Sequence, residues 1–200
     1  MIHQFEQMSP EWYEYRSGRV SASHMSDVMA KGTGITREKY MIRLMLERIS
    51  GTPGDTYQSA SMLWGIENEP LARLAYELNR DCDVVQVGFI DHPSIDMFGA
   101  SPDGLIDEGM IEIKCPDSHT HYQYMTSGKV PGGYMKQMQA QMLCAEKSWV
   151  DFISFDPRYP EKHKMFVKRV ERDDEMIEKI EDETIRFIEE LNEKIERLSA

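Results

Sequence analysis

The fold of this chain is decided by two short stretches, Ser101-Pro102-Asp103-Gly104 and Ile111-Glu112-Ile113-Lys114-Cys115-Pro116. In the second stretch isoleucine alternates with charged residues, and this period of two predicts a half-buried β-strand. Glu112 and Lys114 then point to one face of the sheet, and the isoleucines point to the other. Because the first stretch is typical of a turn, we expect Asp103 to return beside Glu112 at the rim of the sheet.

Two carboxylates that converge with a lysine form a site for a hard cation. Oxygen ligands favour Mg²⁺, or Mn²⁺ in its place, over zinc. Such a site suits phosphodiester hydrolysis, because the metal polarises the phosphate and acidifies a bound water that Lys114 orients or deprotonates. The alternative is that Asp103 only forms a turn while Glu112 and Lys114 lie on a solvated sheet face. The pattern by itself leaves both interpretations open.

Helical and strand patterns alternate along the 200-residue chain. Apolar periodicity and capping signals predict helices over residues 9–18, 23–30, 36–51, 59–80, 118–126, 132–146 and 173–200. Runs rich in β-branched residues predict strands over residues 84–90, 97–101, 110–114, 149–155 and 164–169. The fold class is therefore α/β, with a central mixed β-sheet flanked by helices and a long C-terminal helix. We expect one domain over residues 1–200, with a mainly helical part (1–82), a sheet that carries the metal site (83–172) and an acidic helix (173–200).

Composition argues against several classes of protein. The chain is 40% hydrophobic and 29% charged, which is ordinary for a globular domain, and it has neither a long apolar run nor a signal-peptide pattern at its N-terminus. We therefore expect a cytoplasmic protein without a membrane span. Its three cysteines form no C-x-x-C pair, which argues against a disulfide framework, a zinc ribbon or an iron–sulfur cluster. Use of ATP is not expected, because no G-x-x-x-x-G-K-[ST] motif is present and Gly32-Thr33-Gly34 is too weak a signal for a phosphate loop.

The arrangement Pro-Asp…Glu-x-Lys resembles the motif of the restriction-endonuclease-like nucleases. The fuller string from Ser101 to Pro116 resembles the bacteriophage lambda exonuclease family of viral recombination nucleases. Three further blocks are similar to that family and occur in its order: Trp12–Ser23, Trp64–Asn68 and Tyr134–Gln139. The resemblance spans about residues 12 to 170 and implies a restriction-endonuclease-like core.

The resemblance implies a role for individual residues of the metal centre. Asp103, Glu112 and the backbone carbonyl of Ile113 would hold a metal, and Lys114 would act on the attacking water. Glu67 would support a second ion or its waters, so that two Mg²⁺ ions per site are expected. Read without the resemblance, Glu67 is one exposed helix acid among several.

A second set of residues would bind a 5′-terminal phosphate by the same resemblance. These residues are Arg16, Ser21, Ser23 and Ser101, with Gln137 between them and the metal centre. Guanidinium and hydroxyl donors match phosphate oxygens, and fixing the end of a strand decides which bond is cut. The alternatives are a surface salt bridge for Arg16 and helix capping for the serines at 21 and 23. The histidines at 119 and 121 diverge on a helix, so a packed or solvated pair is expected rather than a metal site.

By resemblance, the chain is expected to be an Mg²⁺-dependent exonuclease that digests one strand of linear double-stranded DNA in the 5′-to-3′ direction. It would release 5′-mononucleotides and leave a 3′ overhang for recombination. The expected partners are DNA ends, two further copies of the chain in a ring-shaped homotrimer, and a phage single-strand annealing protein. Two alternatives remain: another restriction-endonuclease-like nuclease such as a RecB-like enzyme, or a non-catalytic module that binds DNA ends or a recombinase.

The net charge of −12 is distributed unevenly along the sequence. Residues 173–200 contain eleven acids and four bases, whereas residues 16–48 contain seven bases against three acids and residues 158–172 six against two. Phosphate binding needs local positive charge. We therefore expect DNA to lie against the two basic segments and the acidic helix to face solvent or a protein partner.

Overall fold

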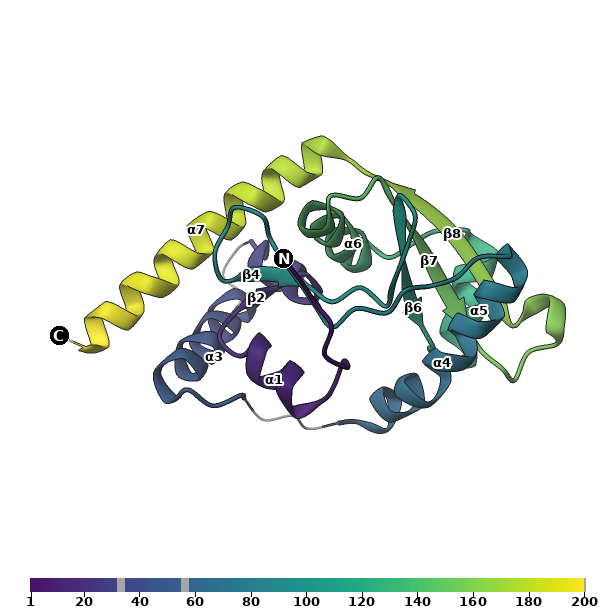
Figure 1. Cartoon of the computed structure of the whole chain (residues 1–200), viewed down its shortest axis with the longest axis horizontal. Helices are drawn as coiled ribbons and strands as arrows, with labels where there is room; N and C mark the ends of the chain where they lie inside the picture. Colours follow the sequence, from purple (N-terminus) through teal and green to yellow (C-terminus); the bar gives the residue numbers. More distant parts are fainter. Residues whose placement is uncertain (32–34, 55–57, 200) are drawn as a thin grey trace.

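The chain folds into two mixed four-stranded sheets surrounded by helices (Figure 1). The computed structural model describes residues 1–31, 35–54 and 58–199. The strands are β1 (Ile2–His3), β2 (Val20–Ser21), β3 (Phe89–Asp91), β4 (Phe98–Ala100), β5 (Gly104–Ile106), β6 (Gly109–Lys114), β7 (Trp149–Phe155) and β8 (Met165–Glu171). The helices are α1 (Pro10–Arg16), α2 (Met25–Val28), α3 (Thr36–Ser50), α4 (Ala60–Arg80), α5 (Ser118–Ser127), α6 (Gly132–Ala145) and α7 (Asp174–Ser199), with short 3-10 helices at Ala22–His24 and Glu161–His163.

The α/β class and the long C-terminal helix are confirmed, but the single central sheet is wrong. The strand order is β1-β3-β4-β2 in one sheet and β5-β6-β7-β8 in the other. The predicted strand at 84–90 is divided between them: Val85 bridges to Leu105, while β3 pairs with β1 and β4. Gly88 lies between the two parts, and a Cβ there would lie 2.2 Å from the backbone oxygen of Phe5. The chain can therefore change sheets there only at a residue without a side chain.

The second sheet carries the β6 strand that the alternating pattern predicts. β5 and β6 form an antiparallel hairpin in which Gly104 pairs with Ile111, and β6 continues parallel to β7. Ile111 and Ile113 pack on one side with Ala72 and Tyr76 of α4. Met110 and Glu112 face the opposite side, toward α6. The sheet is thus covered on both faces, and the solvated sheet face considered for Glu112 is wrong, because its side chain is 1% exposed.

Helix α4 runs unbroken through Pro70, although a proline inside a helix usually breaks or kinks it. Its buried residues, Asn68, Ala72 and Tyr76, recur every four positions and lie on both sides of the proline. Packing against the β5–β8 sheet therefore holds the two halves in line despite the missing backbone donor. The opposite face exposes leucines at 63, 71, 74 and 78, each at least 47% accessible.

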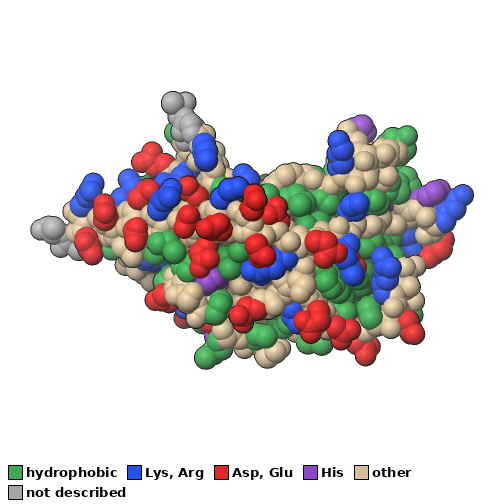
Figure 2. Space-filling view, turned by 90° about the horizontal axis from the view of Figure 1, so that it is seen from above, with side chains coloured by type: hydrophobic (Ala, Val, Ile, Leu, Met, Phe, Trp, Pro, Cys, Tyr) green, Lys and Arg blue, Asp and Glu red, His purple; other side chains and the backbone are tan. Residues whose placement is uncertain are grey.

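Helices α6 and α7 complete the core. Met138 and Met142 of α6 are fully buried between the two sheets, and Ile180, Phe187 and Leu191 of α7 close the same core from outside. The outer surface of α7 carries acidic side chains interspersed with basic ones (Figure 2). Across the described residues, no helix combines the length and apolar character required to span a bilayer.

Candidate active site

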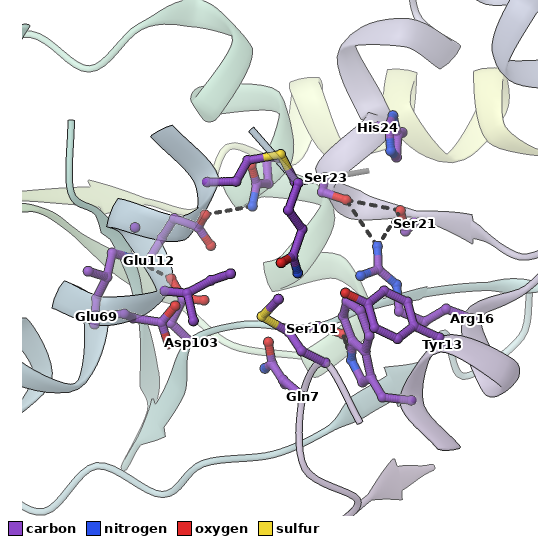
Figure 3. A pocket seen from close by; sticks show the side chains of 18 of the residues that line it. Gln7, Tyr13, Arg16, Ser21, Ser23, His24, Glu69, Ser101, Asp103 and Glu112 are labelled. Atoms are coloured by element: carbon purple, nitrogen blue, oxygen red, sulfur yellow. Dashed lines mark hydrogen bonds between the residues drawn. The ribbon is translucent and has the colours of Figure 1, made fainter. Parts of the chain in front are cut away.

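A cavity of about 820 Å³ lies between the two sheets and is bordered by α1, α4 and α6. Carboxylates from the β5–β6 hairpin line one part of it, and Arg16 with Ser21 and Ser23 lines another (Figure 3). Nearly every residue that the resemblance implicates borders this space. The exception is Glu67, which is discussed below.

The hairpin brings Asp103, which directly precedes β5, and Glu112 of β6 to the cavity. Asp103 ends the turn before β5, and its Oδ2 accepts a 2.6 Å hydrogen bond from the backbone N–H of Ile113. Glu112 lies on β6, and its Oε1 is bound by the ammonium group of Lys114. The spacing of two residues puts Glu112 and Lys114 on the same side of the strand, as the sequence predicts.

Two glutamines of α6 hold the other donors to Glu112. Gln137 Nε2 lies 2.7 Å from Oε1, and Gln141 Nε2 lies 2.6 Å from Oε2. The two amides are one helical turn apart, so the helix presents both to the same carboxylate. A buried ionised carboxylate requires such partners, and here both of its oxygens have them.

Burial and mutual repulsion dominate the electrostatics of the carboxylates. Burial raises the pKa of Asp103 well above its ordinary value, and the nearby charges of Glu112 and Glu69 raise it further. Burial likewise raises the pKa of Glu69. For Lys114, burial alone would lower the pKa, but the charges of Glu112 and Asp103 outweigh burial and raise it. The cluster therefore has excess negative charge that a cation would neutralise.

Glu69, rather than Glu67, is the α4 carboxylate at the cavity. Glu67 is exposed and does not line the space, whereas Glu69 lines it one turn after Gly65. Glu69 also accepts a 2.6 Å hydrogen bond from Arg73 Nη2. Side chains two positions apart on a helix point about 200° away from each other, so only one of these two acids can face the site. The prediction of Glu67 at the metal centre is therefore corrected to Glu69.

The donor set fits a hard divalent cation. Among the described residues, no group of three His, Cys, Asp or Glu side chains is arranged to hold a metal ion. Protein donors engage Asp103 Oδ2 and both oxygens of Glu112. Asp103, Glu112 and Glu69 nevertheless border one space and offer only oxygen. Gln141 Oε1 is buried there without a partner among the described residues, and a water carried by the cation would satisfy it.

The second part of the cavity gathers hydrogen-bond donors. Arg16 Nη2 lies 3.2 Å from Ser21 Oγ and 3.3 Å from Ser23 Oγ, and the two hydroxyls lie 3.0 Å apart. Burial lowers the pKa of Arg16 to about 10, so the guanidinium stays charged at neutral pH. Within the described part of the chain, Arg16 makes no ion pair, so the salt-bridge alternative is not realised. Ser21 occupies the N-cap position of the 3-10 helix Ala22–His24, but its side chain makes no capping hydrogen bond.

Two features of the site have little signal in the sequence. Trp12, in α1, stacks on Arg16 and reaches Ser101, although the sequence marks it only as part of a block. Gln141 joins Gln137 at Glu112, and the four-residue spacing of the two glutamines puts them on one stripe of the helix. His121 is a packed residue, as expected, with Nδ1 lying 2.7 Å from Ser154 Oγ, while His119 is exposed. Gly32-Thr33-Gly34, the weak phosphate-loop signal of the sequence, lies outside the described residues.

Comparison with known proteins places the chain by sequence and by fold. Residues 11–148 match the YqaJ-like viral recombinase domain. The chain is 45% identical to an alkaline exonuclease, LHK-Exo from Laribacter hongkongensis, with a TM-score of 0.90 over 96% of both chains. A structure of LHK-Exo in complex with dAMP matches equally well, at 45% identity and a TM-score of 0.90 over 95% of this chain and 96% of that one.

More distant relatives share less. A phage-related exonuclease from Haemophilus somnus 129PT is 14% identical with a TM-score of 0.70, over 90% of this chain and 96% of that one, and so supports the fold alone. Uncharacterized protein R354 of Acanthamoeba polyphaga mimivirus is 25% identical over 170 residues, which are 76% of this chain. The match spans only 29% of the length of that relative. The domain match and the 45% identity to LHK-Exo show that the chain belongs to the family of YqaJ-like viral recombinase domains.

Proposed function

We propose that this chain is a metal-dependent 5′-to-3′ exonuclease that digests one strand of linear double-stranded DNA from a 5′-phosphorylated end. The observation that carries this proposal is the two-part cavity. Hydrogen-bond donors suited to a phosphate and a carboxylate–lysine cluster border the same space. The similarity to an alkaline exonuclease supports a nuclease activity. Products would be 5′-mononucleotides and a 3′ overhang suited to recombination by strand annealing.

The chemistry divides between the two parts of the cavity. Arg16, Ser23 and Ser101 would bind the terminal phosphate and so place the next phosphodiester at Asp103 and Glu112. These two carboxylates, with Glu69 and the Ile113 carbonyl, would hold Mg²⁺ or Mn²⁺, in two ions per site. The bound metal would polarise the phosphate and supply an acidified water. Lys114 is positioned to orient that water, and Gln137 to fix the carboxylate between the two parts. No nucleotide triphosphate is required.

Exposed apolar residues on α4 support the expected homotrimer. Leu71, Leu74 and Leu78 are 52%, 54% and 77% accessible, and they follow one another along the outer face of the helix. A leucine stripe of this kind usually marks a protein interface. A closed ring of three copies would surround the DNA and keep the enzyme on its substrate. A phage single-strand annealing protein would then take up the overhang.

The test is a time course on linear duplex carrying either a 5′-phosphate or a 5′-hydroxyl, with Mg²⁺ or with a chelator. We expect Mg²⁺-dependent release of mononucleotides that is faster from the phosphorylated end and absent in Asp103→Asn. Equal rates on both ends would exclude the phosphate site. Undiminished cutting of closed circular DNA would indicate an endonuclease, and DNA binding without hydrolysis would indicate a non-catalytic end-binding module.

A further inference from the structure

Trp12 contacts both Arg16 and Ser101, two of the residues proposed to donate hydrogen bonds to the phosphate. Its side chain is 8% exposed, and its ring lies 4.0 Å from the Arg16 guanidinium carbon. Its indole N–H donates to the backbone oxygen of Gly88 at 2.9 Å and to Ser101 Oγ at 3.1 Å. Arg16 and Ser101 come from parts of the chain that are far apart in sequence, so one side chain sets their relative position.

The indole N–H of Trp12 leaves the Ser101 hydroxyl free to change its hydrogen-bond partner. In the structure, the Ser101 hydroxyl donates its only proton to the Gly88 oxygen at 2.8 Å. To donate to a phosphate, that hydroxyl has to turn away from Gly88. The indole N–H still reaches the Gly88 oxygen, so no buried acceptor is left unpaired when the hydroxyl turns.

The stacked ring acts on Arg16 in a different way. A buried guanidinium is costly to hold charged, as its lowered pKa shows. The face of the indole attracts a cation and fixes the plane of the guanidinium, while Nη2 points to Ser21 and Ser23. The ring therefore holds the arginine ready for a phosphate.

We propose that Trp12 is a positioning residue that sets the preference for a 5′-phosphorylated end, by holding Arg16 and by freeing the Ser101 hydroxyl to bind the phosphate. This inference rests on the proposed phosphate site. The indole would not itself touch the phosphate and would act through Arg16 and Ser101.

The experiment compares kcat/KM on 5′-phosphate and 5′-hydroxyl duplexes for Trp12→Phe, Ser101→Ala and the double variant. Phenylalanine keeps a ring under Arg16 but has no N–H, so the Ser101 hydroxyl would stay on the Gly88 oxygen. We therefore expect the preference ratio to fall by about tenfold, the size of one lost hydrogen bond from Ser101 to the charged phosphate. The double variant should be no worse than Ser101→Ala, because the indole N–H acts through that hydroxyl. Trp12→His, which restores an N–H donor, should recover part of the ratio.

Trp149→Phe is the matched control. The ring of Trp149 lies 3.5 Å from the Arg169 guanidinium carbon, and neither residue lines the cavity. This variant should leave the ratio unchanged, and melting temperatures should show that each variant is folded. An unchanged ratio in Trp12→Phe, or additive losses in the double variant, would overturn the inference. If Arg16→Met also leaves the ratio unchanged, the phosphate site itself is wrong. If Arg16→Met lowers the ratio and Trp12→Phe does not, only the role of Trp12 is wrong.

Discussion

Glu112 is a buried carboxylate that three neighbouring side chains support. It is 1% exposed and receives hydrogen bonds from Lys114, Gln137 and Gln141. A lone ionised carboxylate at that depth would be strongly destabilising. Three donors from two elements make the charge tolerable and hold the carboxylate toward the cavity.

Glu69 and Glu67 offer a direct test at the scale of single residues. Glu69→Gln should lower the rate of DNA hydrolysis by about 10- to 100-fold, since it removes a charge that faces the proposed metal site. Glu67→Gln on the same helix should stay close to wild type. Steady-state hydrolysis at several Mg²⁺ concentrations measures both variants. A loss in Glu67→Gln of the same size would restore the earlier assignment.

Strands β7 and β8 of the second sheet and helix α4 meet at Asp151. The carboxylate on β7 is 1% exposed and accepts hydrogen bonds from Tyr76 of α4 at 2.7 Å and from Arg169 of β8 at 2.8 Å. Burial alone would raise the pKa of Asp151, but the hydrogen bonds from Arg169 and Tyr76 outweigh burial and lower it. Asp151 thus joins helix α4, through Tyr76, to the edge strand β8, through Arg169.

The lowered pKa of Asp151 predicts how stability depends on pH. The folded state binds fewer protons at this carboxyl than the unfolded state, so its stabilising effect is present above the ordinary carboxyl pKa, about 4, and is lost as pH falls through the folded value. Asp151→Asn should lower the free energy of unfolding at neutral pH by about 1–3 kcal/mol and flatten the acid side of the profile. Urea unfolding at neutral and acid pH measures both effects. A profile as steep as that of wild type would assign the acid sensitivity to other carboxyls.

Helix α4 contains a glycine that its own fold does not require. Gly65 lines the cavity, and a Cβ there would meet nothing within 4 Å. Because glycine in a helix interior costs about 0.5–1 kcal/mol relative to alanine, Gly65→Ala should raise the free energy of unfolding by about that amount. Under the proposed function it should also weaken duplex DNA binding, since the open space is where DNA approaches the helix.

Gly132→Ala supplies the control for this element. Gly132 is also helical and also has open space around it, but it does not line the cavity. Thermal melts and DNA titrations of both variants separate stability from binding. If both variants bind DNA as wild type does, the DNA does not pass over Gly65.

Charge is arranged over the whole molecule differently from the expected map. Several bases of the two basic segments make internal pairs: Arg37 binds Glu190 of α7, Arg158 binds Asp156, and Arg169 binds Asp151. Part of the acidic helix is therefore an internal partner of residues 16–48, and not only an outer surface. Arg16, Arg19 and Arg43 line the cavity, although Arg19 also pairs with Asp91 and Arg43 with Glu47. Under the proposed function, the cavity is therefore where DNA phosphates would meet positive charge.

The leucine stripe of α4 predicts the assembly state. Leu74→Lys with Leu78→Lys should convert the proposed trimer to monomers, because charged side chains in an apolar interface are costly. Hydrolysis of long duplexes should lose processivity, whereas digestion of short ones should continue. Sedimentation measures the mass, and Leu198→Lys at an exposed position of α7 is the control. A wild-type monomer, or an assembly unchanged by the double variant, would contradict this interface.

The local features can be predicted from the amino-acid sequence alone. The alternation in β6, the turn at Asp103 and the pairing of Glu112 with Lys114 follow from a period of two and from turn chemistry, which act over a few residues. Helix ends were predicted closely, because caps are local too. The family blocks led to Arg16, Ser21, Ser23, Ser101 and Gln137, all of which border the cavity.

The rotation of α4, the division into two sheets and the contacts of Trp12 depend on tertiary packing. Apolar periodicity would turn the leucines of α4 inward, yet Asn68, Ala72 and Tyr76 are the buried residues and the leucines stay outside. That rotation brings Glu69 to the site and turns Glu67 away. Packing against distant strands sets it, and a local pattern gives the period of a helix without saying which side of it another surface will cover.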